Sequence, residues 1–310
     1  MILTVTLNPS VDRLIYVKQL VPHDTNRILR IEEDAGGKGV NVARVLRRLG
    51  VPVVATGFLG GRAGRYVQRE LSEIDGVECR FVRVQGDTRT NLAIQEEDGS
   101  PPTTLNERGP QISAQELDAL LQIVEELSRN AQFVALGGSL PPGVPSDIYA
   151  TLGEIAARHG AKVVLDADGE PLLLGLKASP FLIKPNENET ERLLGRAINT
   201  LEDAARAAQE LHGSGVPMVI VSIGEKGAAI ASAEGCWVAI PPRIRAISTV
   251  GSGDSMIAGV LSVLVRGGTV EEAIRWGTAA GAATAMTDGS DIGTAEQIHN
   301  LLSQVEVRQW

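Results

Sequence analysis

The sequence predicts an α/β fold in which a mainly parallel sheet is covered by helices on both faces and carries a small β-lid. Two patterns support this fold. From about residue 131, apolar runs of strand length alternate with helix-length segments, which is typical of a parallel sheet buried on both faces. Nearer the N-terminus, residues 13–21 alternate like a half-exposed strand, which indicates a second, smaller sheet.

The regular part of the chain can be followed element by element. Strands are expected at 132–138, 161–168, 181–186 and 217–224, and helices at 146–160, 188–195 and 201–215. The last third predicts two consecutive helices rich in small residues, at 253–268 and 270–289.

The first third is less regular. Residues 1–9 predict a core strand, and residues 36–50 predict a glycine turn that enters a helix. Between 79 and 106 the pattern predicts short antiparallel strands joined by turns. We therefore expect a β-lid made from two insertions, at about 12–34 and 84–108. Because no repeat or low-complexity linker interrupts the chain, residues 1–310 are expected to form a single domain.

Composition excludes several classes of function. The chain of 310 residues has a net charge of −9, which argues against a nucleic-acid partner. Cys79 and Cys236 match no metal or redox spacing. The first residues lack the pattern of a signal peptide, and no apolar stretch reaches the roughly 18 residues of a membrane span. We therefore expect a cytoplasmic protein with no membrane partner.

The segment "STVGSGDSMIAG" (248–259) places two glycines and an acid at the start of an apolar helix. Free amides at a helix N-terminus form an anion site. An acid there suits a transferring phosphoryl group, because Asp254 can accept the proton of the attacking hydroxyl. The alternative is that Asp254 caps the helix. Neither glycine turn of the chain matches a dinucleotide fingerprint or a P-loop.

Three segments together resemble the ribokinase/PfkB family of sugar kinases. They are "GGKGVNVARVLRRLG" (36–50), "KPNENE" (184–189) and "STVGSGDSMIAG". With "TLNPSVD", "TRTN" and "GGSLPPG", they resemble the branch that acts on phosphorylated ketohexoses, which contains 1-phosphofructokinase and tagatose-6-phosphate kinase. The resemblance covers essentially the whole chain. It implies a ribokinase-like three-layer α/β/α sandwich with a β-lid.

The resemblance also implies roles at the ATP end of the site. Asp254 would be the catalytic base, with Gly251, Ser252 and Gly253 as the anion hole. Asn186 and Glu189 would hold Mg²⁺ through water, a pattern that suits this cation. Lys184 would contact the ATP phosphates. Without the family, residues 184–186 could equally be a strand end and turn. The nucleotide would contact Ser222, Gly224, Gly227, Thr249, Gly281 and Ala282, although the small residues at 277–285 could equally reflect tight helix packing.

At the sugar end, the resemblance implies contacts from Asp12, Gly36, Gly37, Gly39 and Asn41. The phosphate already on the substrate would be held by Lys38 and Arg89, and Ser139 would contact the phosphosugar. Arg27 would reach the site of a neighbouring subunit in a homodimer joined through the lid. An exposed lid face carrying Leu14, Ile15 and Val17 would suit that pairing. Arg108 is a further candidate, with a solvated loop charge as the favoured alternative.

These observations predict an ATP-dependent, magnesium-requiring hexose-phosphate kinase that resembles 1-phosphofructokinase. Tagatose-6-phosphate or fructose-6-phosphate kinase is the alternative, and a kinase for an unphosphorylated sugar or nucleoside is a further one. A sugar-phosphate sensor that has lost the chemistry would be the non-enzyme alternative. The intact glycine hairpin with Asp254 and Glu189 argues against the sensor.

Overall fold

The computed structural model describes the whole chain, residues 1–310, and contains two sheets. The larger sheet has eleven strands in the order β15-β14-β13-β12-β11-β10-β9-β1-β4-β5, with β6 also paired to β4. Its strands are β1 (Ile2–Thr6), β4 (Val53–Gly60), β5 (Glu78–Cys79), β6 (Val82–Val84), β9 (Phe133–Gly137), β10 (Lys162–Asp166), β11 (Leu182–Ile183), β12 (Met218–Ser222), β13 (Ala228–Ser232), β14 (Gly235–Ile240) and β15 (Glu306–Gln309). All pairs from β12 to β5 are parallel, and β13 to β15 add an antiparallel edge. The predicted mainly parallel sheet is confirmed.

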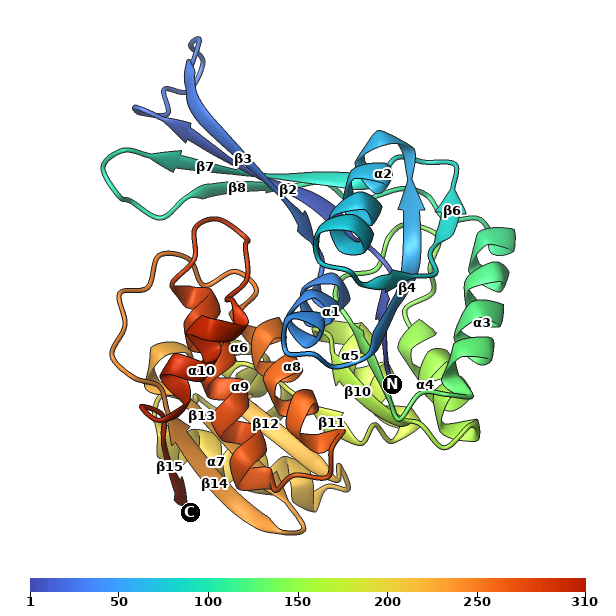
Figure 1. Cartoon of the computed structure of the whole chain (residues 1–310), viewed down its shortest axis with the longest axis vertical. Helices are drawn as coiled ribbons and strands as arrows, with labels where there is room; N and C mark the ends of the chain where they lie inside the picture. Colours follow the sequence, from blue (N-terminus) through green and yellow to red (C-terminus); the bar gives the residue numbers. More distant parts are fainter.

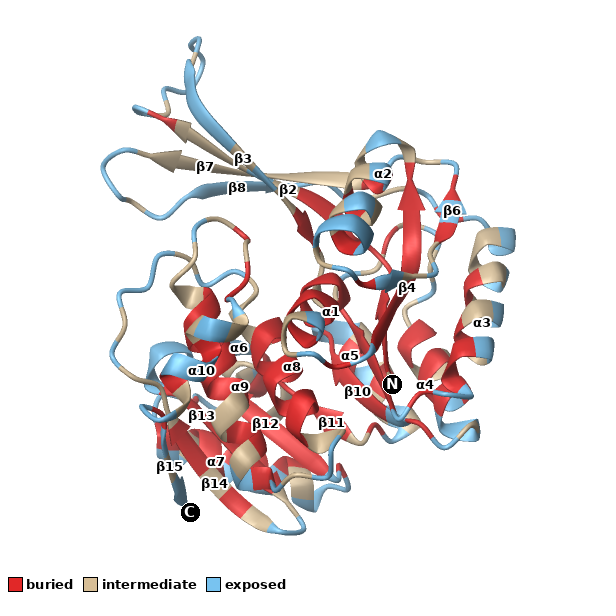
Figure 2. Ribbon diagram, viewed as in Figure 1, coloured by how far each residue is buried: buried red, intermediate tan, exposed pale blue.

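Helices cover both faces of this sheet (Figure 1). Neighbouring residues in each strand point to opposite faces, so that Phe133 packs in one core cluster and Val134 in the other. The first face carries α1 (Lys38–Arg48), α2 (Gly61–Arg69), α8 (Ser252–Leu264), α9 (Val270–Ala285) and α10 (Ala295–Leu302), and the second carries α3 (Ala114–Ser128), α4 (Ile148–Arg158), α5 (Gly169–Gly175), α6 (Glu187–Leu194) and α7 (Leu201–Gly213). The buried residues lie between these layers (Figure 2). None of the helices has the length and apolarity that crossing a membrane requires.

The smaller sheet is the lid, which projects from the body (Figure 1). It contains β2 (Ser10–Val17), β3 (Ile28–Gly36), β7 (Arg89–Glu96) and β8 (Thr103–Asn106), in the order β3-β2-β7-β8. The central pair β2–β7 is parallel, so the expectation of a wholly antiparallel lid is wrong. Each insertion forms a hairpin whose first strand runs outward from the body, and these two first strands lie side by side.

Two further expectations about this region are corrected. The strands expected near residues 79–84 are not antiparallel, because β5 and β6 each pair in parallel with β4 of the body. Val17 is 3% exposed, so it does not lie on an exposed lid face. Leu14 and Ile15 are half-buried and therefore not fully exposed either. The large apolar side chains that do face solvent on the lid are Val21, Ile28, Leu29, Ile31 and Leu105.

The parallel strands bring several polar residues to one edge of the sheet. Asp166 ends β10, and Lys184 directly follows β11. After β1, the next strand of the chain that joins this sheet is β4. It pairs with β1 on one side, whereas β9 pairs with β1 on the other side. The strand order therefore reverses at the β1/β9 boundary, which is where open α/β sheets bind ligands. Asn8 and Ser139 follow these two strands.

Candidate active site

Asp254 lies in the first turn of α8, but it is not the N-cap. Gly251 occupies the cap position with φ of 76°, a left-handed conformation that favours glycine, and no side chain caps the helix. The Ser252 amide donates to the Thr249 carbonyl over 3.3 Å, while the Gly253 and Asp254 amides have no backbone acceptor. The capping alternative is therefore wrong, and the helix start keeps free N–H groups that suit an anion.

The carboxylate of Asp254 is buried and held by one neighbour. Asn41 of α1 donates from Nδ2 to Asp254 Oδ2 over 2.9 Å, and Asp254 Oδ1 forms no hydrogen bond. Burial raises the pKa of Asp254 to about 6, a rise that Lys38 opposes and Asp166 reinforces. A carboxylate with this pKa is ionised at neutral pH, yet it is a stronger base than an exposed aspartate.

Lys38 and Lys184 converge on the buried carboxylate of Asp166. Their ammonium nitrogens lie 2.9 and 3.6 Å from its two oxygens. Although burial opposes the charge, the two lysines lower the pKa of Asp166. Burial likewise opposes the charge of Lys38, but Asp166 and Asp254 raise its pKa. Sequence reasoning missed Asp166, whose only signal was its place at the end of the predicted strand 161–168.

Lys184 lies beside the start of α8. A Cβ on Gly253 would approach its Nζ to 3.1 Å. Asn186 caps α6, since its Oδ1 accepts the Glu189 amide while Glu189 Oε2 accepts the Asn186 amide, both over 2.9 Å. Residues 184–186 are thus a strand end and a helix cap, as the alternative held, and they also bring Lys184 to the glycine hairpin.

The residues predicted for the nucleotide lie on several elements. Ser222 ends β12 and its amide donates to the Pro185 carbonyl. Gly224 begins a short 3₁₀ turn, and Thr249 is exposed ahead of α8. Gly227 has φ of 116°, and a Cβ there would lie 2.1 Å from the Ala239 carbonyl oxygen.

Gly281 and Ala282 lie on α9. A Cβ on Gly281 would approach the Ser252 carbonyl oxygen to 3.1 Å, and Ala282 is buried. Gly281 therefore allows α9 to pack closely on α8, as the helix-packing alternative held.

At the sugar end, Asp12 of β2 is held by two donors. Ser10 Oγ and Asn91 Nδ2 both donate to its Oδ1, over 2.7 and 2.8 Å. Asn91, on β7, was not among the predicted residues. The Gly36 Cα lies so close that a Cβ there would come within 2.1 Å of Asp12 Oδ2.

Gly37 caps α1 with φ of 122°, and a Cβ on Gly39 would approach Thr6 Oγ1 to 2.5 Å. The glycines therefore let the first turn of α1 pack against β1. This packing brings Asn41, in the same helix, to Asp254, so the glycine turn and the glycine hairpin meet at one carboxylate.

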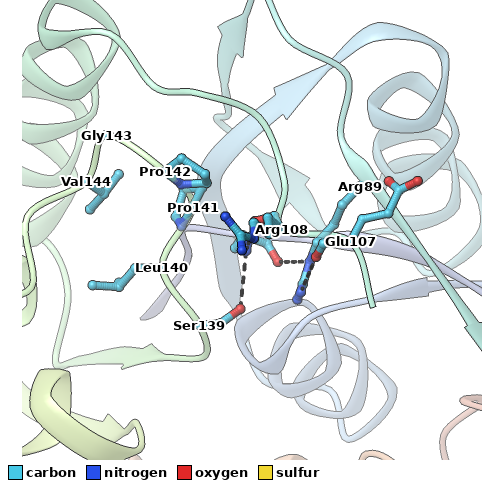
Figure 3. Close-up of a pocket in the computed structure, with 10 residues that line it drawn as sticks. Arg89, Glu107, Arg108, Ser139, Leu140, Pro141, Pro142, Gly143 and Val144 are labelled. Atoms are coloured by element: carbon cyan, nitrogen blue, oxygen red, sulfur yellow. Dashed lines mark hydrogen bonds between the residues drawn. The ribbon is translucent and has the colours of Figure 1, made fainter. Parts of the chain in front are cut away.

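A separate pocket of about 420 Å³ lies between the lid and the body. Arg89, Arg108 and Ser139 line it, together with Glu107 and residues 140–144 (Figure 3). Neither arginine has a carboxylate within ion-pairing distance, whereas Arg44 and Arg48 of α1 both pair with Asp75. Burial lowers the pKa of Arg89, against the opposing charges of Asp12 and Glu107.

The structure separates two cations that the sequence assigned to one phosphate. Arg89 lines this pocket, whereas Lys38 pairs with Asp166 and is absent from the pocket lining. Arg108, for which a solvated loop charge was favoured, does line the pocket. Arg27 is exposed between β2 and β3 at the lid tip and makes no ion pair within the chain.

Fold and site together define the class of this protein: an α/β enzyme with a β-lid and an anion-binding helix start next to a buried carboxylate. The pfkB family carbohydrate kinase model matches residues 5–297. The chain belongs to this family, whose members transfer a phosphoryl group from ATP to a hydroxyl of their substrate.

Named relatives extend over nearly the whole chain. It is 38% identical over 307 residues to the 1-phosphofructokinase of Bacillus subtilis, covering 99% of each protein. It is 34% identical over 308 residues to the 1-phosphofructokinase of Borreliella burgdorferi, covering 99% of this chain and 98% of the relative. The structure of phosphofructokinase-2 from Escherichia coli with substrates and products has a TM-score of 0.91, 31% identity and 98% coverage of both chains. Another structure of that enzyme is of a tetrameric inhibited form.

Proposed function

We propose that this enzyme phosphorylates fructose 1-phosphate to fructose 1,6-bisphosphate at the expense of ATP. The observation that carries the proposal is the pocket at the β1/β9 boundary, where Arg89 and Arg108 lack carboxylate partners. Such guanidinium groups suit a phosphate, which accepts hydrogen bonds from several donors. The relatives named 1-phosphofructokinase support this choice of substrate.

The pocket adjoins the carboxylate cluster, so one sugar can reach both. A Cβ on Gly138 would lie 3.9 Å from the Lys38 side chain, and Gly138 directly precedes Ser139. A ketohexofuranose carries hydroxymethyl groups on both sides of its ring. With the 1-phosphate on Arg89 and Arg108, the other hydroxymethyl group extends toward Asp254.

The chemistry then follows from the local geometry. Asp254 accepts the hydroxyl proton on Oδ1, the oxygen that Asn41 leaves free. The sugar oxygen forms a bond to the γ-phosphorus of ATP as the bond to the β-phosphate oxygen breaks and ADP leaves. The free amides of Gly253 and Asp254, with Lys38 and Lys184, oppose the negative charge on the transferring group. Asp166 keeps both lysines charged and in place.

Magnesium is proposed next to Glu189, because this buried residue keeps Oε1 outside the capping box. Asn186 commits its oxygen to the helix cap and would act by holding the start of α6. When bound, the ion would neutralise charge on the ATP phosphates through its waters.

The lid is proposed to pair with the lid of a second copy, and all 310 residues to form one catalytic domain. Exposed Ile28, Leu29, Ile31 and Leu105 support the pairing, since exposed apolar edge strands favour association. Arg27, exposed at the lid tip, would then reach the partner's site.

A coupled assay of ADP release tests the proposed substrate. The panel contains fructose 1-phosphate, fructose 6-phosphate, tagatose 6-phosphate, fructose and ribose, with and without Mg²⁺. We expect the highest kcat/KM for fructose 1-phosphate. A preference for either 6-phosphate would change the substrate within the class. A preference for a bare sugar would refute the proposed phosphate pocket.

A further inference from the structure

Three polar side chains that line the proposed phosphate pocket come from three separate parts of the chain. Arg89 begins the lid strand β7, Arg108 follows the lid strand β8, and Ser139 follows the body strand β9. A phosphate site needs these groups at fixed spacing. No hydrogen bond joins the three side chains directly to one another.

One residue of the body touches all three parts. Asn8 Nδ2 donates to the Arg108 carbonyl oxygen over 3.1 Å and to Ser139 Oγ over 3.2 Å. The backbone carbonyl oxygen of Asn8 accepts a hydrogen bond from Arg89 Nε over 3.2 Å. Asn8 also lines the pocket, and it is 4% exposed.

The orientation of the Asn8 amide is determined by its surroundings. Both Nδ2 hydrogens are used, and a rotated amide would place Oδ1 against the Arg108 carbonyl oxygen, which cannot donate. Oδ1 is buried without a partner and faces Gly109, where a Cβ would lie 2.2 Å from it. Pro9 restricts Asn8 to an extended backbone, which directs its carbonyl group.

We propose that Asn8 is a positioning residue that holds Ser139 and the Arg108 segment around Arg89, and so creates the preference for a phosphorylated sugar. This inference rests on the proposed function and names the residue that organises its phosphate end. Asn8 belongs to the motif "TLNPSVD", but no role of its own was predicted for it.

Three variants test this role, two at Asn8 itself and one at Gly109, which lies against the Asn8 amide. Asn8→Ala removes both donated hydrogen bonds. Asn8→Asp keeps the volume but replaces the donor with a negative charge beside the phosphate. Gly109→Ala leaves Asn8 intact but displaces its amide by steric contact. Gly99→Ala is the matched control, because Gly99 also has positive φ, at 77°, in the β7–β8 connection, but nothing lies within 4 Å of its Cβ position.

The measurements are KM for fructose 1-phosphate, KM for ATP, kcat, and the ratio of kcat/KM for fructose 1-phosphate over fructose. For Asn8→Ala and Gly109→Ala we expect KM for fructose 1-phosphate to rise roughly ten- to a hundredfold, as for the loss of one or two hydrogen bonds. The ratio should fall by a similar factor, with KM for ATP and kcat little changed. Asn8→Asp should raise KM further, and Gly99→Ala should match the parent.

The outcomes separate this inference from the proposed function. A parent enzyme with no preference for the phosphorylated sugar would end the proposed function. A parent with that preference, whose Asn8 and Gly109 variants keep it, would end this inference alone. Equal losses for ATP and sugar, with a lower melting temperature, would show that Asn8 serves only stability. If Asn8→Ala does not fold, Asn8→Asp and Gly109→Ala decide the matter.

Discussion

The hydrogen bond from Asn41 to Asp254 should set the pH range in which the enzyme works. The Asn41 amide donates to the ionised carboxylate, so it favours the charged form and lowers the pKa, whereas burial raises that pKa to about 6. A hydrogen bond to a charged group is worth about 1.5–3 kcal/mol, and one pKa unit corresponds to about 1.4 kcal/mol. Asn41→Ala should therefore raise the pKa of Asp254 by about one to two units.

The assay is the pH profile of kcat/KM for the phosphosugar, from about pH 5 to 9. The parent should lose activity below about pH 6, where Asp254 becomes protonated. The acid limb of Asn41→Ala should move to about pH 7–8, with recovery toward its own plateau above that. The second ionisation of a phosphate monoester also lies near pH 6, but it affects both enzymes equally, so the difference between the profiles reports Asp254.

Asn91→Ala is the matched control, because this amide donates over a similar distance to Asp12 and not to Asp254. We expect it to change KM for the sugar without moving the acid limb. If the acid limbs of Asn41→Ala and the parent coincide, the hydrogen bond from Asn41 does not set the pKa of Asp254.

Four further predictions concern chemistry, metal, substrate and assembly. Asp254→Asn should lower turnover by roughly two to four orders of magnitude. It should also melt higher than the parent at pH 8, because the pKa of Asp254 in the folded enzyme is about 6, above its ordinary value of 3.8. The parent therefore loses roughly 3 kcal/mol of stability as pH rises through about 6. The difference in melting temperature should close toward about pH 4, and equal melting curves at pH 8 would contradict it. Glu189→Gln should raise the Mg²⁺ concentration for half-maximal rate with little change in phosphosugar KM, and an unchanged Mg²⁺ dependence removes Glu189 from the metal site. Arg89→Ala should raise the phosphosugar KM about ten- to a hundredfold and leave the ATP KM unchanged, whereas equal effects on both would place Arg89 elsewhere. Light scattering should give a dimer of the 32.8 kDa chain that Ile31→Glu dissociates, and a monomeric parent at micromolar concentration argues against any role for Arg27 in a partner's site.

The sequence alone predicted the body of the fold, because parallel strands buried on both faces leave long apolar runs. The expected strand at 132–138 is β9, and the expected helix at 201–215 is α7. The antiparallel edge of β13 to β15 was not predicted. Exposure explains this only for β15 (Glu306–Gln309), which is mostly exposed and carries little periodic signal, whereas β13 and β14 are largely buried. The parallel pairing of β2 with β7 depends on two insertions that meet only in three dimensions.

The same division applies to the site. The anion-binding turn before Asp254 was predictable because backbone conformation over a few residues depends on the local glycines. Which side chains face one another was decided by the tertiary structure, through the strand order for Asn8 and through the packing of α1 against α8 for Asn41 and Asp254. Asn41 and Asp254 are 213 positions apart, and Asn8 and Arg108 are 100 apart. Only the folded chain brings such pairs within hydrogen-bonding distance, because the contacts of a buried polar group depend on which strands and helices are neighbours.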